Sequence, residues 1–179
     1  MMKKIIFLLV FILLAVGVSA CARKDAPAGG LWNGEEIKPV GETETIKLYY
    51  YNPDIDRDEA GNIVCSEQGL VAVEREIGGL DSLSAEEKIK VIIGLLLQGE
   101  LSAAEQDSGI TTEFPLSGLE LAGLSLNDGE LILEFSDPEN KTVGGSCRVA
   151  ILWAQIAATA RQFPEVEAVS FSPEEFFQP

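Results

Sequence analysis

The spacing of hydrophobic residues alternates between two periods along the chain, and this pattern most limits the folds that the sequence can adopt. Apolar residues recur at every second position, as in half-buried strands, over residues 45–51, 69–77, 124–136 and 166–171. They recur at helical spacing over residues 84–99 and 146–163. The order β-β-α-β-β-α-β predicts an α+β fold with a mixed or mainly antiparallel sheet of about five strands and two helices packed on it.

Local signals mark where these elements begin and end. Ser84 and Glu87 stand three residues apart at the start of the first helical segment, which is the spacing of a capping box. Gly99 follows this segment and predicts its C-terminal cap. Residues 127–129, Asn-Asp-Gly, separate two alternating runs and predict a tight hairpin turn. The helical stripe of the second segment includes Trp153, which is therefore expected in the core.

The first 20 residues have the layout of an export signal, because two lysines precede an unbroken apolar run over residues 5–16. Residues 17–21, Gly-Val-Ser-Ala-Cys, resemble the bacterial lipobox, at which cleavage leaves a lipidated cysteine. We therefore expect Cys21 to carry a diacylglycerol that holds the protein at the extracytoplasmic face of the cell membrane. An uncleaved membrane anchor is the alternative.

Composition divides the remainder of the chain and restricts its partners. Residues 21–44 are rich in Gly, Pro and charge and are expected to form a flexible tether, followed by a folded domain over residues 45–172 and a tail over residues 173–179. The formal charge is −16, and loss of the signal with its two lysines brings it to −18. Such a surface repels nucleic acid and anionic headgroups, so membrane association is expected to come from the acyl chains.

The sequence offers little for catalysis. It contains no histidine and no Gly-x-Ser-x-Gly motif. Residues 144–147, Gly-Gly-Ser-Cys, come nearest to a reactive motif, but without a histidine partner they are better explained as the start of a helix. We therefore expect the protein to have no enzymatic activity and to bind no cofactor.

An acidic stretch after residue 51 raises the question of a calcium site. A register that begins at Asp56 places Asp58 and Glu67 at EF-hand ligand positions, but Ala60 offers no side-chain oxygen at position 5. A register that begins at Asp54 lacks both the turn glycine and the final acid. Since the preceding segment alternates like a strand, we expect a solvated loop between paired strands, with Asp56, Asp58 and Glu67 as the residues to examine for a metal.

Two cysteines remain in the folded part, Cys65 and Cys147. An exported protein meets conditions in which they could pair. The sequence does not give their separation in space, so a disulfide and two free thiols both remain open.

Three segments together resemble the GerMN domain, also called the sporulation and spore germination domain. They read "IKLYYYNPD…GLVAVEREI", "AEEKIKVIIGLLLQGE" with "GITTEFPLSGLELAGLSLNDGELILEFS", and "VAILWAQIAATARQFPEVEAVSF". The resemblance covers residues 45–172. It implies an extracytoplasmic, commonly lipid-anchored module without catalytic residues, which supports sporulation, germination or envelope assembly by binding other proteins.

Two functions of different kinds follow. The first is a non-enzymatic interaction module that contacts envelope or sporulation proteins. The alternative is a ligand-binding lipoprotein that holds calcium or a small molecule at the acidic stretch or beside Tyr49 and Tyr51, although these tyrosines are better explained by packing within a sheet.

Overall fold

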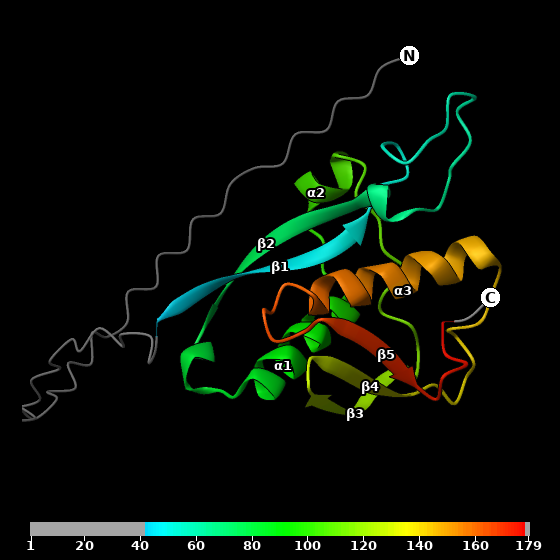
Figure 1. Cartoon of the computed structure of the whole chain (residues 1–179). Coiled ribbons are helices and arrows are strands. Elements are labelled where there is room, and N and C mark those ends of the chain that lie inside the picture. The colour runs from blue at the N-terminus through cyan, green and yellow to red at the C-terminus, as the bar shows by residue number, and fades with distance from the viewer. Residues whose placement is uncertain (1–41, 178–179) are drawn as a thin grey trace, which may run out of the picture. The chain divides into compact units, whose positions relative to one another are not determined.

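The computed structural model describes residues 42–177, and it contains every helix and strand that the periodicity predicts. In chain order the elements are β1 (Thr43–Tyr51), η1 (Glu67–Gly69), β2 (Leu70–Gly78), η2 (Leu80–Ser82), α1 (Ala85–Gln98), α2 (Ala103–Asp107), β3 (Glu120–Asn127), β4 (Glu130–Ser136), α3 (Ser146–Ala160) and β5 (Ala168–Ser172) (Figure 1). The α+β class and the β-β-α-β-β-α-β order are confirmed, with the short helix α2 in addition.

The five strands lie in two sheets, whereas a single sheet was expected. β1 pairs with β2 antiparallel, while β4 pairs antiparallel with β3 and parallel with β5. The two long helices lie between the sheets: α3 packs against β1, α1 packs against both β1 and β3, and the helices contact each other. The parallel β4–β5 pair requires a crossover, which α3 supplies.

Side chains in the last turn of α3 and just after it explain why β1 does not pair with a third strand. The amide of Lys47 donates to Gln162 Oε1 at 2.9 Å, and Gln162 Nε2 donates to the Lys47 carbonyl at 2.8 Å. The amide of Tyr49 donates to Thr159 Oγ1 at 3.0 Å. Because the backbone groups of Lys47 and Tyr49 already have partners, no further strand pairs along this edge of β1, and only Tyr51 forms an isolated antiparallel bridge, with Thr111.

The local signals act as predicted at several element boundaries. Ser84 and Glu87 form a complete capping box on α1, and Gly99 caps its C-terminus in the left-handed conformation, with φ of 67°. Asp128 also adopts a positive φ, of 49°, in the turn between β3 and β4. Helix α3 ends at Ala160, three residues before the predicted end at Phe163.

Two predicted domain boundaries differ from the structure. β1 begins at Thr43, inside the segment assigned to the tether. The segment taken as a tail packs on the core, since Phe177 is 4% exposed and its ring contacts those of Phe135 and Phe171 at centroid distances of 5.4 and 5.1 Å. The predicted signal peptide, Cys21 and residues 22–41 of the tether lie outside the described residues. Within residues 42–177, no helix has the length and apolar character needed to cross a membrane.

Candidate interaction surface beside the disulfide

The acidic loop, which we define as residues 52–66, connects β1 to η1 and projects from the domain (Figure 1). Its tip is a small hairpin in which Arg57 and Ile63 form an antiparallel bridge. Asp58 Oδ1 accepts hydrogen bonds from the amides of Ala60 and Asn62 at 2.9 and 2.8 Å. A side chain that binds its own turn in this way orders the tip locally.

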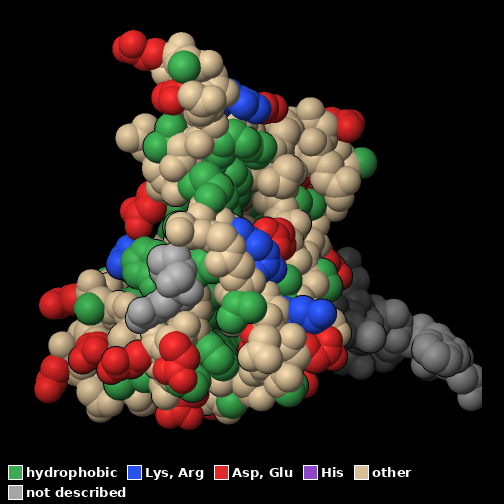
Figure 2. Space-filling view, turned by 90° about the vertical axis from the view of Figure 1, so that its right-hand side faces the viewer, with side chains coloured by type: hydrophobic (Ala, Val, Ile, Leu, Met, Phe, Trp, Pro, Cys, Tyr) green, Lys and Arg blue, Asp and Glu red, His purple; other side chains and the backbone are tan. Residues whose placement is uncertain are grey.

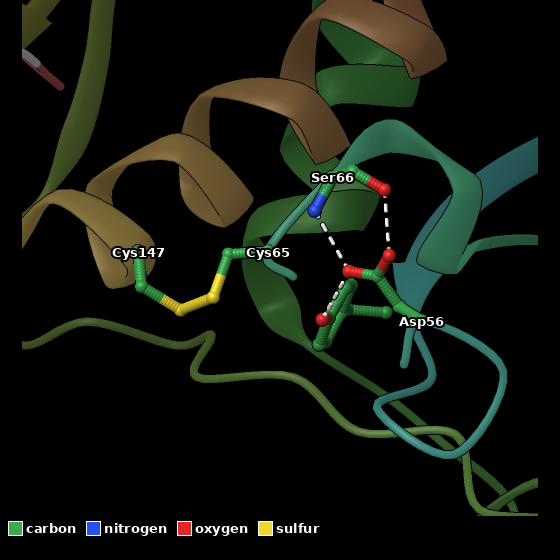
Figure 3. The surroundings of a disulfide bond; sticks show 5 residues. Asp56, Cys65, Ser66 and Cys147 are labelled. Atoms are coloured by element: carbon green, nitrogen blue, oxygen red, sulfur yellow. Dashed lines mark hydrogen bonds between the residues drawn. A yellow bond between two sulfur atoms is a disulfide. The ribbon is translucent and has the colours of Figure 1, made fainter. Parts of the chain in front are cut away.

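Asp56 anchors the loop to the domain. Asp56 is 3% exposed, and its carboxylate accepts hydrogen bonds from the Tyr51 hydroxyl at 2.6 Å, the Ser66 amide at 2.7 Å and the Ser66 hydroxyl at 2.6 Å (Figure 3). Burial tends to raise the pKa of Asp56, but the hydrogen bonds from Ser66 and Tyr51 outweigh it and lower the pKa below its usual value. Burial and the bond to Asp56 raise the pKa of Tyr51 to about 12.

The ring of Tyr51 fits beneath the loop because residue 69 is a glycine. A Cβ atom at Gly69 would collide with the Tyr51 ring and approach the Asp56 side chain. Tyr51 is consequently only 5% exposed, and Tyr50 is completely buried. Tyr49 is half-buried. The tyrosine run therefore serves mainly for packing.

A disulfide ties the end of the loop to the first turn of α3. Cys65 and Cys147 are 82 residues apart in sequence, and their Cα atoms are 5.2 Å apart (Figure 3). Cys65 has a φ of 61°, in the left-handed region that non-glycine residues rarely adopt. Such a conformation persists where its surroundings fix it, and here the disulfide and the contacts of Ser66 with Asp56 do so.

The three residues considered for calcium have separate roles. Asp56 binds Tyr51 and Ser66, Asp58 binds its own turn, and Glu67 forms an ion pair with Arg161 at 3.8 Å. In the part of the chain that the structure describes, no three His, Cys, Asp or Glu side chains are grouped so that they could hold a metal ion. The acidic loop therefore does not have the arrangement of an EF-hand.

A groove of about 560 Å³, lined by both apolar and polar side chains, lies beside the disulfide. Its lining combines the end of the acidic loop and η1, one face of α3, β5 and the segment after β5: Cys65, Ser66, Glu67, Ala150, Trp153, Ala154, Val169, Ser170, Phe171, Glu174, Phe176 and Phe177. Figure 2 shows the side of the domain on which the loop projects, with hydrophobic side chains reaching the surface and acidic side chains gathered toward the lower edge.

Trp153 lines this groove and is only partly buried, in contrast to the core position expected from helical spacing. Its ring packs against the ring of Phe171 at a centroid distance of 6.3 Å, and the Arg161 guanidinium lies 5.3 Å from its centroid. The helical stripe of α3 faces the core over most of its width. The side chain of Trp153 also borders the groove, because β5 and the segment after it cover only part of the indole ring.

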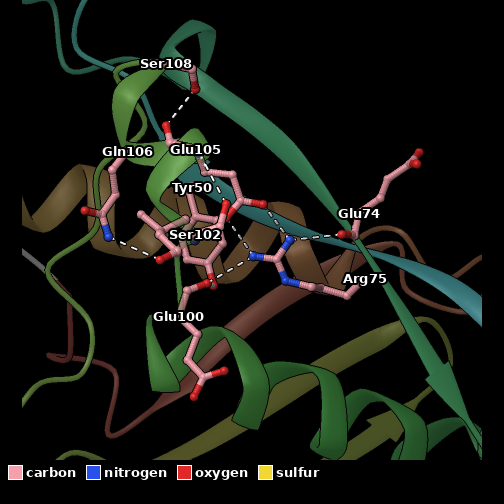
Figure 4. Close-up of polar contacts among 9 residues, drawn as sticks. Tyr50, Glu74, Arg75, Glu100, Ser102, Glu105, Gln106 and Ser108 are labelled. Atoms are coloured by element: carbon pink, nitrogen blue, oxygen red, sulfur yellow. Dashed lines mark hydrogen bonds and ion pairs between the residues drawn. The ribbon is translucent and has the colours of Figure 1, made fainter.

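A second polar cluster joins β2 to α2 (Figure 4). Arg75 forms two hydrogen bonds with the Glu105 carboxylate, at 2.8 and 3.0 Å, and donates to the Glu100 carbonyl at 3.1 Å. The bond from Arg75 is the largest influence on Glu105 and lowers its pKa to about 2. Because these groups bind one another in a two-point geometry, the cluster has the form of a structural ion pair.

Comparison with known proteins identifies a family whose model matches this sequence. The sequence matches the family model described as "Germane: Sporulation and spore germination" over residues 47–175. No curated protein matches the chain.

Similar solved structures include those of a sporulation protein and a candidate lipoprotein. The tandem GerMN domains of the sporulation protein GerM from Bacillus subtilis align with 72% of this chain at 19% identity and a TM-score of 0.44, over 38% of that chain. The present chain thus corresponds to less than half of the GerM chain. A candidate lipoprotein from Clostridium perfringens aligns with 74% of this chain and 74% of its own, at 16% identity and a TM-score of 0.39.

The family match confirms the resemblance that the three sequence segments indicate. It begins at the fifth residue of β1 and extends past the end of β5, so that it takes in almost the whole described domain. The chain belongs to the Germane family of sporulation and spore germination domains.

Proposed function

We propose that this protein is a lipid-anchored, non-enzymatic interaction module that supports sporulation or germination through contacts with other proteins at the extracytoplasmic face of the cell membrane. Membership of the Germane family over residues 47–175 is the observation that carries the proposal. The anchor rests on the lipobox-like residues that end at Cys21.

The use of the ionisable groups supports a role other than catalysis. Tyr51 and Glu105, whose pKa values are shifted to about 12 and about 2, each bind a group that joins two segments of the fold. Catalytic sites commonly need such shifts, but structural ion pairs and buried hydrogen bonds produce them as well. The absence of histidine from the sequence agrees with this assignment.

The face beside the disulfide supports a binding role. The acidic loop is fixed by Asp56 and by the Cys65–Cys147 disulfide, and the adjoining groove exposes part of Trp153. Aromatic side chains that are partly exposed in a concave surface are frequent anchors at protein interfaces.

The experiment that tests the proposal is recovery of the full-length protein from membranes of sporulating and vegetative cells. The matched control is Cys21→Ala, which keeps the domain and removes the lipid attachment point. We expect the unaltered protein in the membrane fraction together with sporulation or germination proteins, and we expect it, unlike Cys21→Ala, to incorporate a labelled fatty acid. Absence of the label from the unaltered protein would contradict the lipid anchor, and retention of Cys21→Ala in the membrane would indicate an uncleaved signal segment.

A second candidate function is the binding of a small molecule, for which the 560 Å³ groove has sufficient volume. If no specific protein is recovered from either cell state, this candidate becomes the better one. A ligand in the groove would then change the fluorescence of Trp153, and a Trp153→Phe variant would not show that change.

A further inference from the structure

The acidic loop exposes an unusual share of the large apolar side chains. Among the described residues five such side chains are exposed, and three of them belong to this loop: Ile55 (56%), Ile63 (45%) and Val64 (54%). The other two, Val91 and Val143, lie on α1 and ahead of α3. Single exposed apolar residues are ordinary, but three on one projecting loop make this loop a candidate for an interaction site.

The loop that carries these side chains is held firmly. Arg57 donates to the Gly61 carbonyl at 3.0 Å and forms an ion pair with Asp54 at 3.0 Å. The Val64 amide donates to the Asp56 carbonyl at 3.0 Å, next to the buried carboxylate and the disulfide. A loop that is ordered before it meets a partner loses less conformational entropy on binding, which favours affinity.

The charges on the loop indicate the kind of partner. Residues 52–66 contain four acids and one arginine. Asp56 is buried and Asp54 is paired with Arg57, so Asp58 and Glu59, in the turn of the hairpin, are the acids that remain beside the exposed apolar side chains Ile63 and Val64. A complementary surface has an apolar depression surrounded by lysine or arginine, and the opposite charges speed its association. Anionic headgroups and a second copy of this acidic chain would both be repelled.

The loop lies at one end of the described domain. It follows the end of β1 opposite to Thr43 (Figure 1). Nine residues of strand span about 30 Å, so the loop starts about this distance from Thr43.

We propose that the acidic loop is a docking element whose side chains Ile55, Ile63 and Val64 enter an apolar depression with a basic rim on a partner protein. The proposal rests on the function proposed above and deepens it, because it assigns the contact surface and the chemistry of the partner.

Site-specific photocrosslinking tests the assignment in the full-length, anchored protein. A benzophenone amino acid replaces Ile63 in one variant and Val91, an exposed valine on α1, in the matched control. We expect the probe at position 63 to form an adduct in sporulating cells with a different protein, and the crosslinked peptide to come from an apolar surface bordered by Lys or Arg. The probe at position 91 is expected to give no such adduct.

Binding of the crosslinked partner then measures the contribution of the loop. We expect Ile63→Ser with Val64→Ser to weaken binding at least tenfold, since central apolar contacts dominate interface energies. Val91→Ser should leave binding unchanged, and the melting temperatures of all variants should stay close to that of the unaltered protein because the sites are exposed. Glu59→Lys should slow association and reduce its dependence on salt.

The outcomes separate the two proposals. Three outcomes would overturn the docking role of the loop. The first is an adduct with lipid or with another copy of this chain, and the second is equal adduct formation at positions 63 and 91. The third is that the Ile63→Ser, Val64→Ser variant binds the partner as tightly as the unaltered protein. If membrane recovery still yields specific partners, the proposed function stands and only the assignment of the loop fails. If neither experiment finds a protein partner, both fail.

Discussion

At the scale of single residues, Asp56 shows how a side chain can have the type expected of a metal ligand and yet serve the fold. Its two oxygens accept three hydrogen bonds from Tyr51 and Ser66, in a site that is 3% exposed. A buried carboxylate with donors on both oxygens is stable as an anion without a cation. The acidic loop is thereby attached to the strand that precedes it.

Replacement of Asp56 measures this attachment. We expect Asp56→Asn to lower the free energy of unfolding by about 1 to 3 kcal/mol, because an amide cannot accept all three hydrogen bonds and leaves a buried donor without a partner. Asp58→Asn is the control at an exposed position of the same loop, and it should cost less. Denaturant unfolding of both variants gives the comparison, and an equal loss would contradict the anchoring role of Asp56.

Glu105 makes the stability depend on pH. Its pKa is lowered to about 2 in the folded protein from 4.5, so its contribution is present above pH 4.5 and is lost as the pH falls from 4.5 toward 2. Asp56 acts in the same direction, since its folded pKa is also lowered. We expect Glu105→Gln to destabilise the protein at pH 7 and to flatten the fall in stability between pH 4.5 and 2.

Unfolding measured across this pH range tests the contribution of Glu105. The control is Glu74→Gln, which removes an exposed carboxylate from β2 next to Arg75 without breaking the Arg75–Glu105 pair. Parallel pH profiles for Glu105→Gln and the unaltered protein would show that the ion pair adds little to stability.

At the scale of secondary structure elements, the disulfide connects two segments that hydrogen bonds do not join directly. It links the end of the acidic loop to α3 across 82 residues of chain. Closing a loop of this length restricts the unfolded chain by roughly 4 to 5 kcal/mol on the entropic model, and measured effects are commonly about 2 to 4 kcal/mol.

We expect a variant with Cys65→Ser and Cys147→Ser to be less stable by about 2 to 4 kcal/mol and to show faster amide hydrogen exchange in residues 52–66. Treatment of the unaltered protein with a reductant should reproduce both effects. Melting curves and amide exchange rates of the variant, the reduced protein and the unaltered protein test this stabilisation by the disulfide. Unchanged stability after complete reduction would contradict it.

Local sequence signals predict the ends of α1 and the turn between β3 and β4, because the interactions that define these features lie within four residues. The capping box of Ser84 and Glu87 and the turn at Asp128 are examples. Helix α2 was missed, although Ser102 and Glu105 form a capping box that could have indicated it. The division into two sheets could not be predicted, since it depends on the contact of Gln162 with Lys47, 115 residues away.

The candidate surface was less accessible to sequence reasoning than the fold. The anchoring role of Asp56 requires Tyr51 and Ser66 to lie next to its carboxylate, and no local sequence pattern predicts this arrangement. Helical spacing placed Trp153 on the inward face of α3, but the extent of its cover depends on β5 and on Phe176 after it. Sites built from several distant segments become visible only when those segments are assembled.

At the scale of the whole molecule, the closure of β1 by Gln162 and Thr159 sets an order of events during synthesis. A ribosome makes Gln162 115 residues after Lys47, which at 5 to 20 residues per second is a delay of roughly 6 to 23 s. During that interval the backbone groups of Lys47 and Tyr49 lack their native partners and are free to pair with other chains, whereas Tyr51 can pair earlier with Thr111. We therefore infer that the newly made chain is most prone to aggregation before α3 emerges, and that a chaperone or continued passage across a membrane is of most use to it in those seconds.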